Sequence, residues 1–208
     1  MTVEPRDVMG GLEPFSLQGW IAKNRHRMIP PIANETIFKG NDTFIVMVSS
    51  GPNTRKDYHY NESEELFLQL EGDIEIGLVV DGEHRVETVR EGELFLIPPK
   101  VPHQPRRPAG TLGLILEKHR VRPEQDGFLW FCDRCGSKLY EEYFFLEDIV
   151  QQFPVVQRAF YDSLERRTCD VCGHVSAQPE GWEQSMGARE QDNPYAPDPH
   201  GAVRGRSW

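Results

Sequence analysis

Short β-rich runs separated by turn residues fill the middle of this chain and restrict its fold more than any other feature. Between about residues 36 and 117, the runs TFIVMVSS, EELFLQL, IEIGLVV, HRVETV, LFLIP and TLGLILE alternate with turn signals such as GPN, EGD, DGE and REGE. Strands this short, at such regular spacing, predict an all-β sandwich or barrel. Asp81 and Gly82 are expected to form a hairpin turn between two of them.

The segments before and after the β-rich region have helical patterns. The sequence predicts a short amphipathic helix over residues 12–29, with Ser16 as its N-cap. Its inward side chains and its stop are predicted to be Trp20, Ile21 and Pro30-Pro31. Residues 146–167 are also predicted to be helical, with Pro154 either interrupting the helix or starting a second one.

Charge and hydropathy restrict the class of partner. The 208 residues carry a formal net charge of -10, which argues against a general nucleic-acid surface because such binding relies on Lys and Arg. No apolar run approaches the roughly 18 residues that span a bilayer, and the N-terminus lacks the basic and apolar regions of a signal peptide. We therefore expect a cytoplasmic protein that acts on a small molecule, without a nucleic-acid or membrane partner.

Four cysteines form two C-x-x-C pairs. Cys132 pairs with Cys135 and Cys169 with Cys172, and a glycine follows each pair. In a reducing cytoplasm this spacing indicates a metal site and not disulfides. Four thiolates can surround one ion tetrahedrally and leave no position open, so the predicted role is structural. Iron and zinc both suit these ligands, and the sequence does not choose between them.

A second group of metal-type ligands lies within the β-rich region. His59, Glu65 and His103 provide two imidazoles and one carboxylate, the facial set that holds non-haem Fe(II) with positions open for dioxygen. A single histidine is more often a surface or core residue, so only the joint pattern carries this prediction. His59 and Glu65 are an even number of residues apart, so both side chains can point to the same face if they lie on one strand without a bulge. A turn at Asn61-Glu62 would place them on two strands, and either arrangement lets them converge.

The segments around these ligands resemble the two sequence motifs of the cupin superfamily. The first motif matches at His59, Asn61, Glu65 and Gly72, and the second at Gly92, Pro98, His103 and Arg107. Asn61 stands where many cupins have a further histidine. The resemblance implies a mainly β cupin fold, a double-stranded β-helix or jelly-roll barrel, with a few helices and a small C-terminal four-cysteine region.

Within the cupins, the chain resembles the 3-hydroxyanthranilate 3,4-dioxygenase family of the bacterial and fungal type over about residues 12–176. The matching stretches are PPIAN at 30–34, GPNTRKDYHYNESEELFLQLEG at 51–72, EGELFLIPPKVPHQPRRP at 91–108, LILE at 114–117, DGFLWFCDRCG at 126–136 and RRTCDVCG at 166–173. The resemblance implies that His59, Glu65 and His103 hold the catalytic iron, with Glu65 also contacting the substrate. It implies that the four cysteines hold a second iron, or zinc, in a rubredoxin-like site.

The same resemblance implies roles for further residues. Arg55 is expected beside the dioxygen and substrate site, Arg107 on the substrate carboxylate, and Glu117 facing the substrate amino group. Asn34 is expected to line the pocket, next to Ala33, where this family is expected to have glycine. The planar fork of Arg107 suits a bidentate carboxylate contact, and Glu117 can take a proton from an amine as a general base.

The implied activity is extradiol-type ring cleavage. Both atoms of dioxygen are inserted into 3-hydroxyanthranilate beside its hydroxyl group, which gives 2-amino-3-carboxymuconate semialdehyde. That product closes to quinolinate, which links the activity to pyridine nucleotide biosynthesis and to the kynurenine pathway of tryptophan catabolism. The resemblance also implies a homodimer.

Pattern and resemblance together divide the chain into four segments. These are an N-terminal helix and pocket-lining segment at 1–35, a cupin barrel at 36–122, a rubredoxin-like four-cysteine region with helices at 123–176 and an extended tail at 177–208. The tail is rich in Pro, Gly and charge, and is expected to bury little surface by itself.

Three other functions stay open at the level of the sequence. One is a cupin dioxygenase for another aminophenol or catechol. Another is a non-catalytic cupin that binds a small molecule, which would need neither Arg55 nor Arg107 beside the metal. The third is a zinc-ribbon interaction protein, for which Arg166-Arg167 offers only a small basic face.

Overall fold

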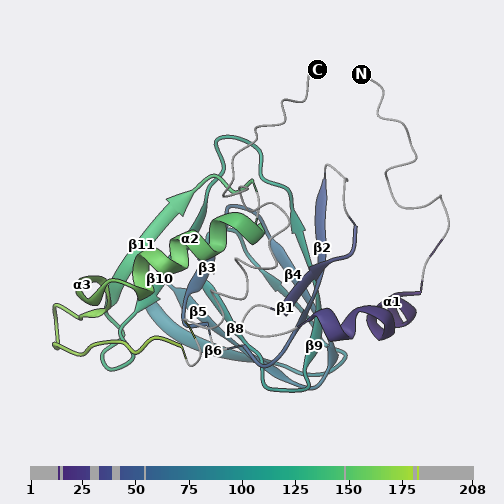
Figure 1. The fold of residues 1–208 in the computed structure, drawn as a ribbon, viewed down its shortest axis with the longest axis horizontal. Coiled ribbons are helices and arrows are strands. Elements are labelled where there is room, and N and C mark those ends of the chain that lie inside the picture. Colours follow the sequence, from purple (N-terminus) through teal and green to yellow (C-terminus); the bar gives the residue numbers. More distant parts are fainter. Residues whose placement is uncertain are drawn as a thin grey trace, which may run out of the picture.

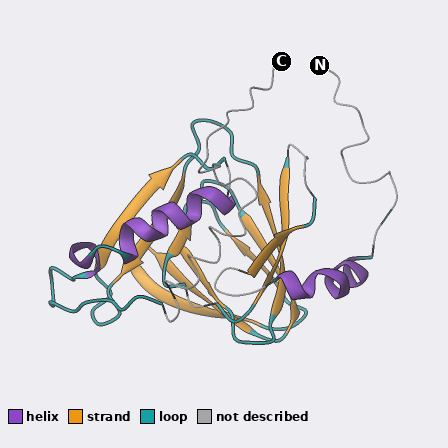
Figure 2. Cartoon of the chain, in the orientation of Figure 1, coloured by secondary structure: helices purple, strands orange, loops and turns teal. Residues whose placement is uncertain are grey.

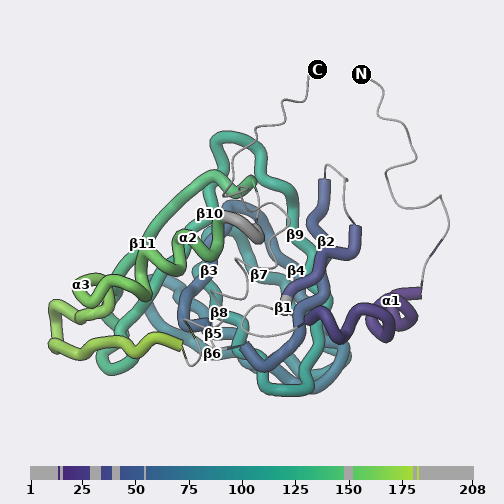
Figure 3. Tube along the Cα trace, viewed as in Figure 1, coloured from purple at the N-terminus to yellow at the C-terminus, as the bar shows by residue number. Residues whose placement is uncertain are grey.

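The computed structural model describes residues 14, 16–28, 33–38, 43–53, 55–147, 149–179 and 182, which form two antiparallel β-sheets with helices outside them (Figures 1 and 2). The five-stranded sheet has the order β1 (Ala33–Thr36), β2 (Phe44–Ser50), β9 (Leu112–Lys118), β4 (Glu65–Glu71) and β7 (Leu94–Ile97). The six-stranded sheet has the order β11 (Lys138–Phe144), β10 (Asp126–Phe131), β3 (Tyr58–Tyr60), β8 (His103–Arg106), β5 (Ile74–Val80) and β6 (Glu83–Val89). The chain therefore crosses repeatedly from one sheet to the other (Figure 3).

The main hydrophobic core lies between the two sheets. Strand alternation turns every second side chain of β2, β4 and β9 inward, where they meet the inward side chains of β5 and β6. This core consists of Ile45, Met47, Phe67, Ile74, Ile76, Leu78, Val89, Ile97 and Ile115. The predicted mainly β fold of packed antiparallel sheets, with few helices and a C-terminal four-cysteine group, is confirmed.

The hairpin predicted between two of the strands is present. Asp81 and Gly82 connect β5 to β6, and both have positive φ, 53° and 79°. Two successive residues in this conformation match the right-handed twist of the strands they join, and an Asp-Gly pair adopts it readily. Turn chemistry alone thus located this connection.

The N-terminal helix packs on the outer face of the five-stranded sheet. α1 (Leu17–Asn24) continues into a 3-10 helix, η1 (Arg25–Arg27). The Ser16 hydroxyl accepts a hydrogen bond from the Gly19 N–H at 3.0 Å, which confirms the predicted N-cap. Ile21 is buried, as predicted, against Val48 of β2, and Trp20 packs partly buried on the same cluster. The predicted stop at Pro30-Pro31 lies outside the described residues.

The C-terminal helices cover β10 and β11 on the opposite flank of the barrel from α1 (Figure 1). α2 (Ile149–Tyr161) runs straight through Pro154, followed by the short α3 (Leu164–Arg167). The prediction that Pro154 interrupts the helix or starts a second one was wrong. Proline removes one backbone hydrogen bond from a helix, and here Phe153 and Phe160 anchor α2 on either side of it by burial against β10.

The described part of the predicted tail contains one firmly packed residue. Trp182 is buried against Tyr161, with ring centroids 4.6 Å apart, and its Nε1 donates a hydrogen bond to Asp162. This one tail residue packs on the C-terminal helices, and residues 180–181 and 183–208 lie outside the described residues. Among the helices that the structure describes, none is long and apolar enough to cross a membrane.

Candidate metal centre and substrate pocket

Two cross-strand residue pairs face each other between the sheets. His59 of β3 lies directly opposite His103 of β8 in the six-stranded sheet. Glu65 of β4 lies directly opposite Glu117 of β9 in the five-stranded sheet. Directly opposite residues of neighbouring strands point to the same side. The fold thus brings two imidazoles from one sheet against two carboxylates from the other.

Three of these side chains could share one metal ion. The Glu65 Oε2 atom lies 3.1 Å from His103 Nε2 and 3.5 Å from His59 Nδ1, and the three candidate ligand atoms are all within 4.8 Å of one another. His103 Nδ1 donates to the Val101 carbonyl at 3.0 Å, which leaves its Nε2 free for a ligand role. Two neutral imidazole nitrogens and one carboxylate are the donor set of non-haem Fe(II) centres, so the residues fit such an ion.

His59 and Glu65 lie on different strands of different sheets. β3 ends at Tyr60 and β4 begins at Glu65, so of the two arrangements left open by the sequence, one strand or two, the two-strand arrangement is present. Asn61, in the intervening turn, is almost fully buried, and its amide donates a hydrogen bond to Glu65 Oε2 at 3.1 Å. Asn61 thus orients the glutamate.

The charges at this centre are strongly coupled. Burial lowers the pKa of His59, but Asp126 and Glu65 outweigh it and raise this pKa to about 9. Burial would likewise raise the pKa of Glu65, but His103 and His59 lower it well below its usual range. The carboxylate is therefore ionised in the folded protein, and a metal ion that binds here displaces a proton from His59.

Arg107 lies beside the three candidate metal ligands and has a hydrogen-bond donor that no described residue uses. It is 3% exposed, and its Nη1 donates to Gln69 Oε1 at 3.2 Å, whereas its Nη2 has no hydrogen-bond partner among the described residues. A Cβ atom on Gly113 would lie 2.8 Å from Nη1, so glycine at this position makes room for the guanidinium. Burial lowers the pKa of Arg107 to about 10, with Glu65 partly opposing it. An anion in the pocket would satisfy both its charge and its free donor.

Arg55 has a fixed position on the other side of the pocket. Its guanidinium forms an ion pair with Asp57, with Nε to Oδ1 at 3.1 Å, and it lies 5.1 Å from the ring centroid of Phe128 and 5.7 Å from that of Phe153. Burial lowers the pKa of Arg55, and Asp57 more than compensates, so the net shift is upward. Arg55 is thus a permanently charged, pre-oriented group.

Glu117 is the second carboxylate of the pocket, and it is 5% exposed. Burial and the nearby charge of Glu65 raise its pKa, while Arg120 acts in the opposite direction. Arg120 Nη2 lies 2.7 Å from Glu117 Oε2 and 2.6 Å from Asp126 Oδ2. The sequence by itself assigned no role to Arg120, or to Asp126 at the start of the matching stretch 126–136, and their burial and contacts identify them.

All the site residues predicted in the barrel lie around one pocket. Its walls come from β1, β2, β3, β4, β8, β9, α2 and the loops before β3 and after β8. Its lining includes Asn34, Met47, Ser49, Asn53, Arg55, Asp57, His59, Glu65, His103, Gln104, Arg107, Ile115, Glu117 and Phe153. Asn34, expected from the resemblance to line a pocket, is at this wall. The side chain of Ala33 lies outside the described part of the structure.

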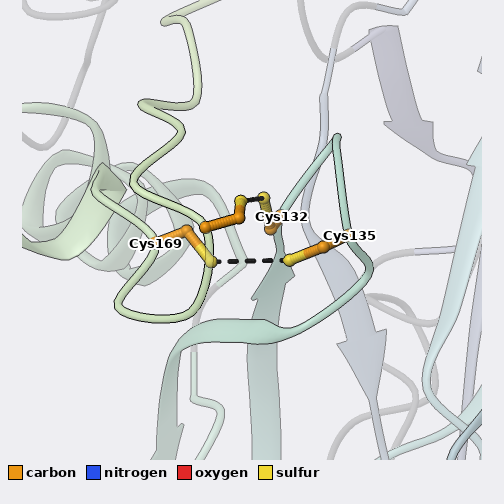
Figure 4. A group of neighbouring side chains, drawn as sticks. Cys132, Cys135 and Cys169 are labelled. Atoms are coloured by element: carbon orange, nitrogen blue, oxygen red, sulfur yellow. Dashed lines mark hydrogen bonds between the residues drawn. The ribbon is translucent and has the colours of Figure 1, made fainter.

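The four cysteines form a separate cluster outside the barrel. Figure 4 shows Cys132 and Cys135 on the loop after β10 facing Cys169 on the loop after α3. Sγ atoms of Cys135 and Cys169 are 3.6 Å apart, as are those of Cys132 and Cys172. Four sulfurs about 2.3 Å from one tetrahedral ion would be about 3.8 Å from each other, so the cluster fits an ion with little movement.

The two knuckles of this cluster have the same backbone design. The first cysteine of each accepts at its carbonyl from the N–H of a glycine four residues later, Gly136 at 2.9 Å and Gly173 at 2.8 Å. Both glycines have positive φ, 73° and 69°, a conformation that other residues rarely adopt. The glycine after each C-x-x-C is thus part of the turn that aims the thiols.

Comparison with known proteins places the chain in a family. The family model described as 3-hydroxyanthranilic acid dioxygenase matches residues 9–161. A 3-hydroxyanthranilate 3,4-dioxygenase from Xanthomonas campestris is 48% identical over 167 residues, covering 80% of this chain and 94% of that protein. One from Ruegeria pomeroyi is 40% identical over 178 residues, covering 84% and 98%. A solved cupin superfamily protein from Desulfitobacterium hafniense aligns with a TM-score of 0.40 at 12% identity, over 52% of this chain and 92% of that one. On the family match and these identities, the chain belongs to the 3-hydroxyanthranilic acid dioxygenase family.

Proposed function

We propose that this protein is an Fe(II)-dependent ring-cleaving dioxygenase that converts 3-hydroxyanthranilate and dioxygen to 2-amino-3-carboxymuconate semialdehyde, the precursor of quinolinate. Both oxygen atoms enter the product, and one ring C–C bond beside the hydroxyl group breaks. Family membership and the relatives' names support this activity. Iron held by His59, Glu65 and His103 would supply open positions where an ortho-aminophenol and dioxygen bind side by side.

The observation that carries the proposal is the free donor of Arg107. Its Nη2 is buried in the same pocket as the candidate metal ligands, and no described residue offers it a hydrogen-bond acceptor. A buried donor left unsatisfied is costly, so this site is built to receive an acceptor from outside the chain. A ring carboxylate can meet the guanidinium in two parallel hydrogen bonds, which fixes the ring plane. The hydroxyl and amino groups of the substrate are then directed toward the three ligands.

Glu117 has the properties of the base for the substrate amino group. Burial and Glu65 raise its pKa, which makes it a better proton acceptor than an exposed carboxylate. It lies opposite Glu65 in the strand register, so a group beside the metal ligands is also beside Glu117. We propose that Glu117 accepts a hydrogen bond from the amine and takes its proton as the ring becomes electron-rich.

Arg55 completes the pocket as a fixed positive charge. Its pairing with Asp57 and its position over Phe128 and Phe153 leave it little freedom to turn. We propose that it stabilises negative charge that develops on dioxygen and substrate, as electrostatic pre-organisation does in other enzymes. Asn34 and Glu65 are the further substrate contacts of this pocket.

A stoichiometric assay tests the proposed reaction. Protein loaded anaerobically with Fe(II) should consume dioxygen and 3-hydroxyanthranilate in equal amounts and form the semialdehyde. 2-Aminophenol, which lacks the carboxylate, and a carboxylated catechol serve as comparison substrates. Absence of turnover with fully occupied iron would refute the substrate assignment, and preference for either comparison substrate would indicate a cupin dioxygenase of different specificity.

Separate alanine substitutions of the neighbouring Arg107 and Arg106 test whether Arg107 binds the substrate carboxylate. Arg107→Ala should weaken binding of 3-hydroxyanthranilate by about 10-fold to 100-fold, because a hydrogen bond to a charged group contributes about 1.5–3 kcal/mol. Iron content should stay the same. Arg106→Ala is the matched control, since Arg106 is half exposed and its contacts are Gln104, Tyr58 and Glu75. Equal losses in both variants, or loss of iron in Arg107→Ala, would contradict the assigned role.

We further propose that the four cysteines hold a structural iron or zinc ion. Their ligand atoms lie within 4.8 Å of one another, and the cysteines are free thiols in the structure. Four thiolate ligands leave no position for substrate. Such a site persists where thiols stay reduced, which supports the cytoplasm as the working compartment. Metal analysis of protein purified without added metal identifies the ion.

We also propose a homodimer, formed through the outer surface of β2, β4, β7 and β9. The residues of this leucine face are Phe44, Leu66, Leu68, Leu94, Leu96 and Leu116, of which Leu94 is 64% and Leu96 57% exposed. A flat apolar sheet face of this kind marks an interaction surface, and two copies can place the same residues against each other. Leu96→Asp should give a monomer in sedimentation, whereas Val155→Asp, at an equally exposed position of α2, should not. A monomeric unaltered protein, or an unchanged Leu96→Asp dimer, would refute this interface.

A further inference from the structure

A buried network of charged side chains links the candidate metal ligand His59 to the pocket carboxylate Glu117. Asp126, at the start of β10, is completely buried, and its Oδ2 lies 2.7 Å from His59 Nε2. Arg120 donates to the same carboxylate twice, from Nε to Oδ1 and from Nη2 to Oδ2, each at 2.6 Å. Arg120 Nη2 also lies 2.7 Å from Glu117 Oε2, and its Nη1 donates to the Lys118 carbonyl at 2.8 Å. One guanidinium thus holds the carboxylate behind His59 and the carboxylate that faces the pocket.

We propose that Arg120 and Asp126 are positioning residues, which fix the orientation of His59 for the metal and of Glu117 for the substrate as one unit. The inference rests on the proposed function for the roles of His59 and Glu117. Neither residue lines the pocket, so both act through the side chains they hold. A purely structural ion pair would need only one carboxylate for Arg120.

The contact to Asp126 determines which nitrogen of His59 faces the metal centre. An ionised carboxylate only accepts hydrogen bonds, so His59 Nε2 must carry the hydrogen. The neutral imidazole then has its lone pair on Nδ1, the nitrogen that points toward Glu65. Carboxylates that contact metal-binding histidines in this way commonly change metal affinity 10-fold to 100-fold when they are removed.

The contact to Glu117 restricts that carboxylate in the same way. A planar guanidinium that is already held by Asp126 and by the Lys118 carbonyl cannot follow a rotating Glu117. The Arg120 side chain is 3% exposed, so water does not replace it in these contacts. The substrate-facing oxygen of Glu117 is thereby kept at one place relative to the metal ligands.

Asp126→Asn tests the metal side of the proposal without substrate. The barrel site of this variant should bind Co(II) or Zn(II) 10-fold to 100-fold more weakly in competition with a chelator. At a pH above the His59 pKa of about 9, where the metal-free ring is neutral, nitrogen-15 NMR should show the His59 hydrogen on Nε2 in the unaltered chain and a mixture of tautomers in the variant. The metal content of the four-cysteine site reports folding. Glu124→Gln is the matched control, because Glu124 is in the same segment but pairs with exposed Lys118.

Arg120→Lys and Arg120→Met test the substrate side. Both should lower kcat for 3-hydroxyanthranilate by more than they change KM, and Lys should restore part of the loss because it keeps the charge but not the fork. Metal affinity of Asp126→Asn within twofold of the unaltered chain, with an unchanged His59 tautomer, would overturn the proposal. Equal kcat in Arg120→Met would do the same. If the unaltered protein fails to oxidise 3-hydroxyanthranilate but Asp126→Asn still loses metal, the proposed function is wrong and the metal-side positioning role stands.

Discussion

The barrel site and the four-cysteine cluster solve the problem of gathering ligands in opposite ways. The cluster takes its thiols from two short knuckles, each closed by a local turn with a glycine at positive φ. The barrel site takes one ligand from each of three strands in two different sheets. The cluster is complete by itself with four ligands. The barrel site has three, and it opens onto a pocket lined by arginine and glutamate.

The difference shows how the number of ligands and the surrounding residues distinguish a structural metal site from a catalytic one. Four thiolates satisfy a tetrahedral ion, so nothing further can bind to it. Two imidazoles and a carboxylate leave several positions of an iron ion available. The surroundings agree with this division, because the barrel site is flanked by the unpaired donor of Arg107 and by Glu117 with its raised pKa. We expect the four-cysteine cluster to stabilise the fold and the barrel site to be catalytic. Each prediction below tests that division of roles.

His59→Ala should have the largest effect, and only on the barrel site. Removal of a ligand should weaken Fe(II) binding there by more than about 100-fold, since even residues behind the ligands contribute 10-fold to 100-fold. Ring cleavage should fall to background. Metal analysis before and after dialysis against a mild chelator measures both sites at once. Loss of the cysteine-bound ion in the same variant would show that the two centres are not independent.

Cys169→Ser should have the converse effect. The ion cross-links loops that are far apart in the chain, and by analogy with a disulfide its loss should reduce the free energy of unfolding by about 3 kcal/mol. For a chain of this size the Tm should fall by roughly 6–12 °C. Fe(II) bound at the barrel site and its affinity should stay unchanged at 15 °C. A variant of normal Tm without cysteine-bound metal would contradict the structural role.

Metal binding to the barrel site should depend on pH in a defined direction. The pKa of His59 in the metal-free protein is about 9, so below that pH the ring carries a proton that the metal must displace. Affinity should therefore rise about tenfold for each unit of pH between 6 and 8, if one proton is released. Calorimetry in buffers of different ionisation enthalpy counts the protons. A flat profile would mean that His59 is already neutral.

Gly173→Ala should have the smallest effect and leave the barrel site alone. No atom lies within 4 Å of the added Cβ, so the cost comes from the backbone, whose φ of 69° is unfavourable for alanine. That cost is about 1–2 kcal/mol. Chemical denaturation of the metal-loaded protein measures it, with kcat and KM as the internal control. If the catalytic constants changed as much as the stability, the knuckle would be coupled to the pocket.

Much of the site could be predicted because its residues belong to recognisable patterns. The cysteines have regular spacing, the ligands and Arg107 match the two cupin motifs, and Glu117 lies in a stretch that resembles the dioxygenase family. Arg120 lies outside the matching stretches, and Asp126 begins one of them without being assigned a role, since buried and exposed charges look identical in a sequence. The prediction for Pro154 was wrong for a similar reason. Helix propensity is local, whereas burial of Phe153 and Phe160 on β10 decides whether the helix continues.

The sequence by itself determined the alternation of strands and turns, the hairpin at Asp81-Gly82, the cap at Ser16 and the ligand types of both metal sites. These properties depend on residues that are close in the chain, so short-range sterics and hydrogen bonding are sufficient to determine them. Only the tertiary structure decided that His59 faces His103 across one sheet while Glu65 faces Glu117 across the other. It also decided that the side chains of Arg107 and Arg120 are buried away from water. Register and burial arise from packing between distant segments, and the hydrophobic core that forms between the two sheets is what selects them.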